Sequence, residues 1–193
     1  MEVVVTNHVT LDGVMQAPAG ADEDPRGGFE HGGWAGPYGD HVLMQAAVEG
    51  LASTTAYLFG RRTYEKMAAF WPHQPADNPY AKVINERDKY VASRTLAEPL
   101  AWANATLLEG DAADAVAALK DQRGGSLSVL GSGDLLQSLI RRDLVDRWVL
   151  LIHPLVLGAG LRLFPDGGAP ARMRLTDSIT TTTGVVIATY ERA

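Results

Sequence analysis

The chain has 193 residues, of which 46% are hydrophobic and 21% charged, which is enough to form one domain around a sizeable core. Seventeen basic residues against twenty-three acidic ones leave a formal charge of −6, which repels phosphate backbones and anionic membranes. We therefore expect neither a nucleic-acid partner nor a membrane partner. Because cysteine is absent, disulfides, thiolate catalysis and cysteine-based zinc sites are excluded.

The N-terminal sequence Met1-Glu2-Val3-Val4-Val5 lacks the basic start and the long apolar run of a signal peptide. No window approaches the ~20 apolar residues of a membrane span. The sequence contains no internal repeat and no low-complexity tract. These features predict a soluble, cytoplasmic protein that forms a single domain over residues 1–193.

Strands and helices alternate along most of the chain. In chain order, the patterns predict a strand at 3–9, a helix at 40–49, a strand at 56–59 that ends at Gly60, a helix at 63–69 that Thr63 can cap, strands at 89–92 and 106–108, a helix capped by Asp111 that continues to Gln122, a strand at 127–130, a helix at 133–141, a strand at 148–152, and strands at 173–182 and 185–190 around a turn at Gly184. Strands separated by helices indicate crossovers in a largely parallel sheet, and the last two strands would form an antiparallel hairpin at its edge. The predicted fold class is an α/β three-layer sandwich.

The exception to this alternation is Gln16–Gly39, where seven glycines and three prolines fall within twenty-four positions. Such a stretch has little helix or strand propensity and is longer than an ordinary connection, so we interpret it as a binding loop or lid. A disordered insertion is the alternative, but the aromatic residues Phe29, Trp34 and Tyr38 argue against it. Trp34 is a candidate substrate-contacting residue, either as one wall of a pocket or as an anchor of the loop.

Two glycine-containing segments lie where a predicted strand passes into a helix. In the first, Gly60 would let the backbone approach a ligand closely, Arg61 and Arg62 supply phosphate donors, and the helix start favours an anion. In the second, Gly131-Ser132-Gly133 forms a turn of the kind that places backbone amides against a pyrophosphate. The third glycine of a full dinucleotide fingerprint is missing, which disfavours an ordinary Rossmann domain.

A third strand end carries Ser93 and Arg94. A cofactor with a 2′-phosphate requires cations at this place, whereas NAD would prefer a carboxylate. Arginines at two strand ends of an acidic protein therefore favour NADPH over NADH. The alternative is that these arginines are merely solvated.

Several motifs together resemble the dihydrofolate reductase-like family, and within it the reductase domain of riboflavin biosynthesis (the RibD C-terminal type). The residues that carry the resemblance are Gly60-Arg61-Arg62-Thr63-Tyr64-Glu65, the turn Gly131-Ser132-Gly133 before a leucine-rich helix, the run Leu144–Pro154 followed by Leu157-Gly158-Ala159-Gly160, and Thr10-Leu11-Asp12-Gly13 after the first strand. The resemblance spans residues 3–191 and implies a dihydrofolate reductase-like sandwich, an oxidoreductase activity and a homodimer.

The resemblance also implies roles for individual residues. It implies that the phosphates of NADPH are bound by Gly60, Arg61, Arg62 and Thr63, and that the adenosine phosphate is flanked by Ser93 and Arg94. It implies that the diphosphate and the nicotinamide side are wrapped by Gly131, Ser132, Gly133, Asp134 and Leu135. It also implies that the residues near the nicotinamide and the substrate are Leu11, Asp12 and Gly13. Where dihydrofolate reductases carry a carboxylate, this chain has Met44, so folate is not the expected substrate. The long loop offers only Arg26 as a cation for a phosphorylated substrate.

The predicted function is an NADPH-dependent reductase of a small heteroaromatic or carbonyl compound, with Asp12 as the candidate catalytic acid and a bound water as its competitor. A catalytically silent NADPH-binding sensor is the first alternative, and an enzyme acting on a sugar phosphate is the second. The five histidines show no metal-ligand spacing, so no metal is expected, and His153 is interpreted as a structural residue at the end of a strand.

Overall fold

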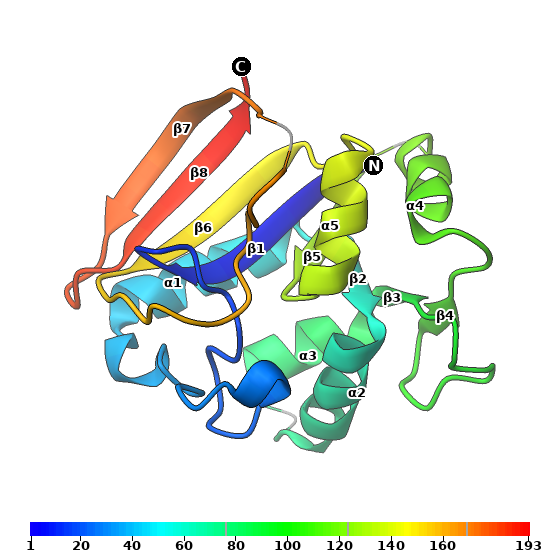
Figure 1. Ribbon diagram of the computed structural model, residues 1–193. Helices are drawn as coiled ribbons and strands as arrows, with labels where there is room; N and C mark the ends of the chain where they lie inside the picture. Colours follow the sequence, from blue (N-terminus) through cyan, green and yellow to red (C-terminus); the bar gives the residue numbers. More distant parts are fainter. Residues whose placement is uncertain (76, 123, 169) are drawn as a thin grey trace. The chain divides into compact units, whose positions relative to one another are not determined.

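The computed structural model describes residues 1–193 except 76, 123 and 169 (Figure 1). Its strands are β1 (Glu2–Thr10), β2 (Ala56–Gly60), β3 (Asp88–Ala92), β4 (Ala105–Leu107), β5 (Ser126–Leu130), β6 (Arg147–His153), β7 (Met173–Thr180) and β8 (Val186–Arg192). The α-helices are α1 (His41–Ser53), α2 (Arg61–Phe70), α3 (Pro79–Glu86), α4 (Ala112–Lys120) and α5 (Gly133–Arg141). The short 3₁₀ helices among the described residues are η1 (Arg26–Gly28), η2 (Gly36–Tyr38) and η3 (Trp71–His73).

Hydrogen bonds join the strands in the order β4-β3-β2-β5-β1-β6-β8-β7. Strand β2 pairs in parallel with β3 and with β5, and β3 pairs in parallel with β4. Strand β8 pairs antiparallel with both β6 and β7. The predicted largely parallel sheet with an antiparallel C-terminal hairpin is thus confirmed.

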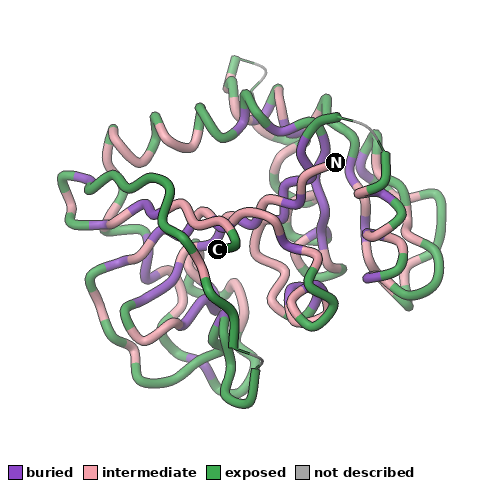
Figure 2. The backbone as a smooth tube through the Cα atoms, turned by 90° about the horizontal axis from the view of Figure 1, so that it is seen from above, coloured by how far each residue is buried: buried purple, intermediate pink, exposed green. Residues whose placement is uncertain are grey.

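Two compact units make up the chain, and each is described separately below. Unit 1 consists of Met1–Val4 and Ala47–Asp146, and unit 2 consists of Val5–Ala46 and Arg147–Ala193. The prediction of a single domain remains a prediction. In both units, buried segments alternate with exposed loops, which appear purple and green in Figure 2. Within the described residues, no helix combines the length and the apolar character needed to cross a membrane.

Strand β2 lies at the centre of unit 1 and is buried on both faces, as expected for a strand inside a parallel sheet. On one face, Tyr57 and Phe59 pack in a cluster of side chains from the three helices nearest to them in sequence, Leu51, Tyr64 and Ile84. Residues of a strand alternate between faces, so Ala56 and Leu58 point to the other side, where α5 contacts β2 and packs against α4. Helices therefore cover both faces of the sheet in this unit.

The first residues of the helices in unit 1 show which predictions of helix starts are confirmed. The predicted cap of α4 is confirmed, since the Asp111 carboxylate accepts hydrogen bonds from the backbone N–H groups of Ala113 and Asp114. Helix α3 was not predicted, although Asn78 caps it and Pro79 occupies its first position. It has only eight residues, which is too short for a clear apolar period to emerge.

The predicted capping of α2 by Thr63 is wrong. The helix begins two residues earlier than expected, with Gly60 at the N-cap, so Thr63 lies inside the first turn. There its hydroxyl accepts a hydrogen bond from the backbone N–H of Ser132 at 3.1 Å. A contact with a distant segment has replaced the local capping contact.

Unit 2 contains the glycine-rich stretch, which is packed rather than disordered. Phe29 and Trp34 are buried in a cluster with Val14, Leu155 and Leu157. Glycine is required at position 32, because a Cβ there would lie 2.2 Å from the carbonyl oxygen of Ala21. The stretch thus forms a hydrophobic core of its own.

The hairpin of unit 2 turns where the sequence predicts. Gly184 has a φ of +86°, and its N–H donates to the carbonyl of Thr181 at 3.2 Å. Strand β7 ends at Thr180, two residues before the predicted end, because Thr181 bonds across the turn to the backbone of Val185 instead of continuing the ladder.

Candidate functional site

Three strand ends of unit 1 meet at one edge of the sheet. Strands β3, β2 and β5 are parallel neighbours, and Gly60 is paired with Ala92 at the ends of β2 and β3. Because the carboxyl ends of parallel strands share an edge, the segments that follow them lie together. The guanidinium of Arg61 donates to the hydroxyl of Thr95 at 2.6 Å, and the N–H of Gly60 donates to the hydroxyl of Ser132 at 3.0 Å. We call residues 60–63, 93–95 and 131–135 the strand-end junction.

Ser132 locks two of these segments to each other. Its hydroxyl accepts from Gly60 and donates to the carbonyl of Leu130 at 3.0 Å, while its N–H donates to Thr63. Its φ of +60° is left-handed, a conformation that costs a residue with a side chain about 1–2 kcal/mol. Gly131 beside it has a φ of +57°, which glycine adopts freely. Strain held in place by hydrogen bonds is typical of binding sites.

Two helices begin at the junction without a capping side chain. The N-cap of α2 is Gly60, which has none, and the N-cap of α5 is Ser132, whose hydroxyl makes no capping bond. In contrast, α3 and α4 are capped by Asn78 and Asp111. First-turn N–H groups that no side chain caps can bind an anion, because they carry the positive end of the helix dipole.

The arginines of the junction are exposed, and Arg61 and Arg62 are paired with carboxylates. Arg61 lies 2.7 Å from Glu65, and Arg62 lies 2.9 Å from Asp134. Exposed ion pairs contribute at most about 1 kcal/mol, so a phosphate could replace either carboxylate at little cost. Arg94 is also exposed.

Ser93 and Leu135 already have structural contacts within the junction. The hydroxyl of Ser93 accepts hydrogen bonds from the N–H groups of Thr95 and Leu96, which holds the turn after β3. Leu135 is buried, and a Cβ added to Gly60 would lie 3.6 Å from its Cβ. A side chain at position 60 would therefore meet only ordinary van der Waals contacts, and Gly133 is the first residue of α5, two positions before Leu135.

In unit 2, Asp12 holds a turn. Its carboxylate accepts hydrogen bonds from the hydroxyl of Thr10 at 2.6 Å and from the N–H groups of Leu157 at 3.2 Å and Gly158 at 2.8 Å. The Thr10 hydrogen bond, more than the two backbone ones, lowers the pKa of Asp12 below its ordinary value. Such a carboxyl is ionised at neutral pH and has no proton to donate. The catalytic role of Asp12 remains a hypothesis, and its contacts are those of a turn residue.

The neighbours of Asp12 differ in exposure. Leu11 is 64% exposed, and Gly13 has a φ of +80° with its N–H bonded to the carbonyl of Thr10. Met44, which stands where a carboxylate would be needed for folate, is exposed on α1.

Trp34 is buried within unit 2, and its indole N–H donates to the carbonyl of Gln16 at 2.7 Å. It therefore anchors the glycine-rich stretch. Its contact with a substrate remains a prediction.

A contact between two histidines of unit 2, the partly buried His8 and the buried His153, was not predicted from the sequence. His8 Nδ1 lies 2.8 Å from His153 Nε2, and burial lowers the pKa of each ring to about 4. His153 is fully buried at the end of β6, as its interpretation as a structural residue requires. No local pattern links two histidines 145 positions apart, so the sequence offers no signal for their contact.

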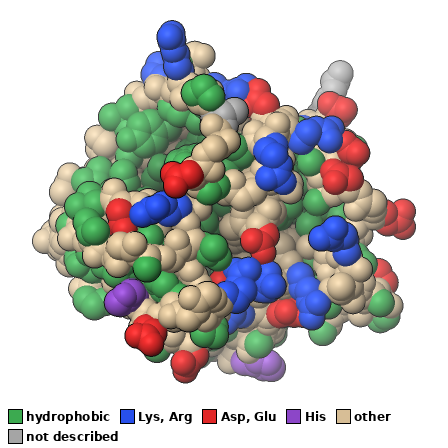
Figure 3. All heavy atoms as spheres, in the orientation of Figure 1, with side chains coloured by type: hydrophobic (Ala, Val, Ile, Leu, Met, Phe, Trp, Pro, Cys, Tyr) green, Lys and Arg blue, Asp and Glu red, His purple; other side chains and the backbone are tan. Residues whose placement is uncertain are grey.

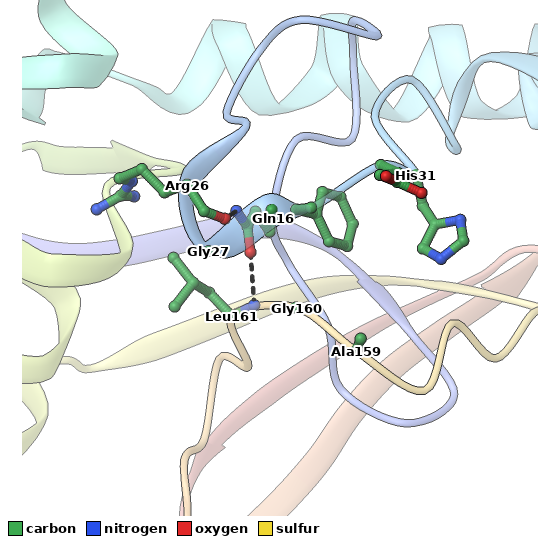
Figure 4. A pocket seen from close by; sticks show the side chains of 10 residues that line it. Gln16, Arg26, Gly27, His31, Ala159, Gly160 and Leu161 are labelled. Carbon is green, nitrogen blue, oxygen red and sulfur yellow. Dashed lines mark hydrogen bonds between the residues drawn. The ribbon is translucent and has the colours of Figure 1, made fainter.

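A pocket of about 330 Å³ lies between the glycine-rich stretch and the segment after β6 (Figure 4). Gln16 lines this pocket. Its amide oxygen accepts from the N–H of Leu161 at 2.8 Å, and its amide nitrogen donates to the carbonyls of Asp24 and Arg26. Arg26 and His31 also line it, whereas Trp34 does not. Among the residues that the structure describes, no group of three His, Asp or Glu side chains could hold a metal ion.

Comparisons with known proteins identify a family. The family model described as the RibD C-terminal domain matches residues 1–187. The uncharacterized protein YyaP of Bacillus subtilis (strain 168) is 26% identical over 195 residues, which cover 97% of this chain and 93% of YyaP. The uncharacterized protein YwjB of the same organism is 24% identical over 119 residues, or 61% of this chain and 63% of YwjB.

Two solved structures share the fold. A protein from Shewanella sp. PV-4 that is named for riboflavin biosynthesis superposes with a TM-score of 0.69 at 22% identity, covering 100% of this chain and 99% of the other. A pyrimidine reductase-like protein from Corynebacterium diphtheriae also gives a TM-score of 0.69, at 13% identity, covering 100% and 92%.

Proposed function

Because the chain belongs to the family of the RibD C-terminal domain, we propose that it is an NADPH-dependent reductase of a small carbonyl or heteroaromatic compound. Family membership confirms the resemblance identified in the sequence and supports a reductase role. The cofactor and the substrate are our inference. The names of the two structural neighbours favour a pyrimidine or a related ring as the substrate class.

The strand-end junction is the observation that carries the cofactor proposal. Two helix starts without capping side chains lie at one sheet edge, beside exposed arginines in exchangeable ion pairs. This combination fits a ligand with a diphosphate and one further phosphate, as in NADPH. Bound there, NADPH would supply the hydride, and the protein would supply position and electrostatics.

Individual residues of the junction would have different tasks. We propose that the first-turn N–H groups of α2 and α5 bind the diphosphate, and that Arg61, Arg62 and Arg94 bind the 2′-phosphate. Ser132 and Thr63 would keep the two helix starts at a fixed separation. Since the pKa of Asp12 is lowered, we propose that the proton comes from water.

One observation favours a catalytically silent NADPH sensor as the second candidate. The acidic residue that the family motif singles out, Asp12, is engaged by three hydrogen bonds of its own unit. Tight NADPH binding without turnover on a panel of pyrimidine and pteridine carbonyl compounds would favour the sensor. A homodimer is proposed from the family resemblance alone, and light scattering measures it directly.

Titration of NADPH and NADH against arginine variants tests the cofactor proposal. One charge-assisted contact to a phosphate contributes about 1.5–3 kcal/mol, so Arg61→Ala and Arg94→Ala should each weaken NADPH about ten- to hundredfold. NADH affinity should change little, because NADH lacks the 2′-phosphate. Arg142→Ala is the control, since Arg142 forms a similar exposed pair with Asp114 at the other end of α5. Equal losses for both cofactors would show that these arginines do not bind the 2′-phosphate.

A further inference from the structure

The two rings of the histidine pair in unit 2 differ in exposure. His153 is fully buried, whereas His8 is only partly buried. The contact between them uses His8 Nδ1 and His153 Nε2. Within the described residues, no hydrogen bond is found for His8 Nε2. His8 Nε2 is therefore the ring nitrogen of the pair that a ligand could reach.

The surroundings of His153 determine which ring nitrogen of each histidine carries the proton. His153 Nδ1 is buried without a hydrogen-bond partner in the described part of the chain. A buried N–H without a partner is rarer and costlier than an unpaired acceptor, so the proton of neutral His153 belongs on Nε2. That N–H then donates to His8 Nδ1. His8 must consequently carry its own proton on Nε2, where it is a donor.

Two aromatic rings of the glycine-rich stretch hold His153 in this orientation. Trp34 and Tyr38 meet the imidazole edge to face, at ring-centre distances of 5.1 and 5.3 Å. Trp34 is fixed by its bond to Gln16, and the carbonyl of Tyr38 accepts from the hydroxyl of Thr183 at 2.7 Å. The ring of His153 cannot turn without disturbing this packing.

The charge of the histidine pair determines which ligand atoms the His8 Nε2–H group can bind. Burial lowers the pKa of both histidines to about 4, so the pair is neutral at physiological pH. A neutral imidazole N–H does not attract a carboxylate or a phosphate strongly, but it polarises a carbonyl oxygen or binds an aromatic ring nitrogen. The fixed proton position makes the donor available without a tautomer change.

From this geometry we infer that His8 is a substrate-binding residue whose Nε2–H donates to a neutral acceptor, a carbonyl oxygen or ring nitrogen, and that His153 is its positioning residue. The inference rests on the proposed reductase function and deepens it, because it restricts the substrate to uncharged acceptors at this position. The sequence predicts a structural role for His153 and no role for His8.

Nitrogen NMR of ¹⁵N-histidine-labelled protein tests the proton position. At neutral pH, His8 should show Nε2 protonated and Nδ1 bare, and His153 should show the same pattern. In His153→Leu, His8 loses its donor and should become a mixture of both tautomers. His153→Gln should restore the single tautomer, because its amide N–H can donate to His8 Nδ1. A protonated Nδ1 in His8 of the unaltered protein would overturn the inference.

Ligand probes test the chemistry of the site. Uracil, a neutral ring with two carbonyl groups, should shift the His8 Nε2 signal saturably, whereas acetate should not. His8→Phe should weaken uracil about five- to tenfold, the worth of one neutral hydrogen bond. His41→Asn, at the exposed start of α1, is the matched control and should leave uracil affinity unchanged. Absence of a saturable uracil shift at His8, or a similar shift with acetate, would overturn the inference.

NADPH affinity, measured on the same samples, separates this inference from the proposed function. Arginine-dependent NADPH binding without a uracil response at His8 contradicts only the role of His8. A uracil response without NADPH binding contradicts only the proposed cofactor.

Discussion

Asp12 and Ser132 are residues that the sequence singled out for a ligand, and both are engaged by the protein itself. The Asp12 carboxylate joins the turn after β1 to Leu157 and Gly158, and the Ser132 hydroxyl joins β5 to Gly60. These partners lie 72 to 146 positions away along the chain. A motif identifies the residue type at a site, but such long-range partners decide whether its polar atoms remain available.

Replacement of Asp12 by Asn distinguishes a role of Asp12 in holding the turn from a role as a proton donor. The amide keeps one acceptor oxygen but would bring an NH₂ group toward the N–H of Leu157 or Gly158. We expect a loss of stability of about 1–3 kcal/mol in urea unfolding, with NADPH turnover within a fewfold of normal. A proton donor would instead lose about 10²–10⁴-fold in turnover at unchanged stability. Asp22→Asn, in the exposed part of the glycine-rich stretch, is the control.

Strands and helices of unit 1 set the geometry of the strand-end junction. Three parallel strands end at one edge, and α2 and α5 start there with Gly60 and Ser132 at their N-caps. Glycine at position 60 is not required by its backbone, whose φ of −74° and ψ of 160° suit any residue. Nor is it required by packing, since a Cβ would find only ordinary contacts at 3.6 Å or more. Close approach of a ligand to the backbone is our hypothesis for glycine at this position.

Gly60→Ala tests this reason. The variant should fold with a melting temperature close to that of the unaltered protein, and it should bind NADPH at least fivefold more weakly, because a methyl group enters the space of the diphosphate. Isothermal titration and a thermal melt measure the two effects. Gly131→Ala provides the contrast, since its φ of +57° should cost about 1 kcal/mol of stability as well. Unchanged NADPH affinity in Gly60→Ala would remove Gly60 from the binding site.

Most elements could be predicted from the sequence because their signals are local. A continuous apolar run predicts β2, the leucine face predicts α5, and Asp111 predicts the start of α4. The strand-end junction was also predictable, because parallel neighbours place their following segments at a common edge. Helix α3 was not predicted because its eight residues show no clear apolar period. The other differences depend on tertiary contacts: Thr63 bonds to Ser132 instead of capping α2, and the His8–His153 contact joins strands far apart in sequence.

At the scale of the whole molecule, the net charge of −6 does not exclude an anionic ligand. Acidic and basic side chains are interspersed on the face shown in Figure 3, so no single basic patch dominates it. Affinity for a phosphate must then come from short-range contacts at a defined site, and it should depend on the shape of the ligand as much as on its charge.

Ligand stabilisation tests this specificity on the intact protein. NADPH at 100 times its dissociation constant should raise the free energy of unfolding by about 2.7 kcal/mol, which corresponds to about 5–10 °C in melting temperature for a chain of this size. Inorganic phosphate and ribose 5-phosphate at the same concentration should raise it much less. Equal stabilisation by ribose 5-phosphate and NADPH would favour the sugar-phosphate enzyme over the reductase.

The stability of the whole protein should depend on pH through the pair of His8 and His153. Both folded pKa values are lowered to about 4, whereas an unfolded histidine titrates near 6.5. Between these values the unfolded chain binds more protons, so the free energy of unfolding rises with pH and reaches its full value above about pH 6.5. The gain is at most about 1.4 kcal/mol per pH unit for each histidine.

Carboxyl groups affect stability in a lower pH range than the histidines do. The assignment of the pH dependence to the histidines is therefore testable. The pKa values of Asp12 and Asp40 are lowered, the latter to about 2 by its hydrogen bond with Thr182, so their contribution disappears only below about pH 4. Urea unfolding at about pH 5 and pH 7 should therefore show a marked difference in the unaltered protein. His8→Leu removes one of the two groups and should reduce that difference by about half, whereas His41→Asn, which alters an exposed histidine, should leave it intact. An equal pH dependence in His8→Leu and the unaltered protein would mean that other groups carry it, and that the pair is not held neutral by the fold.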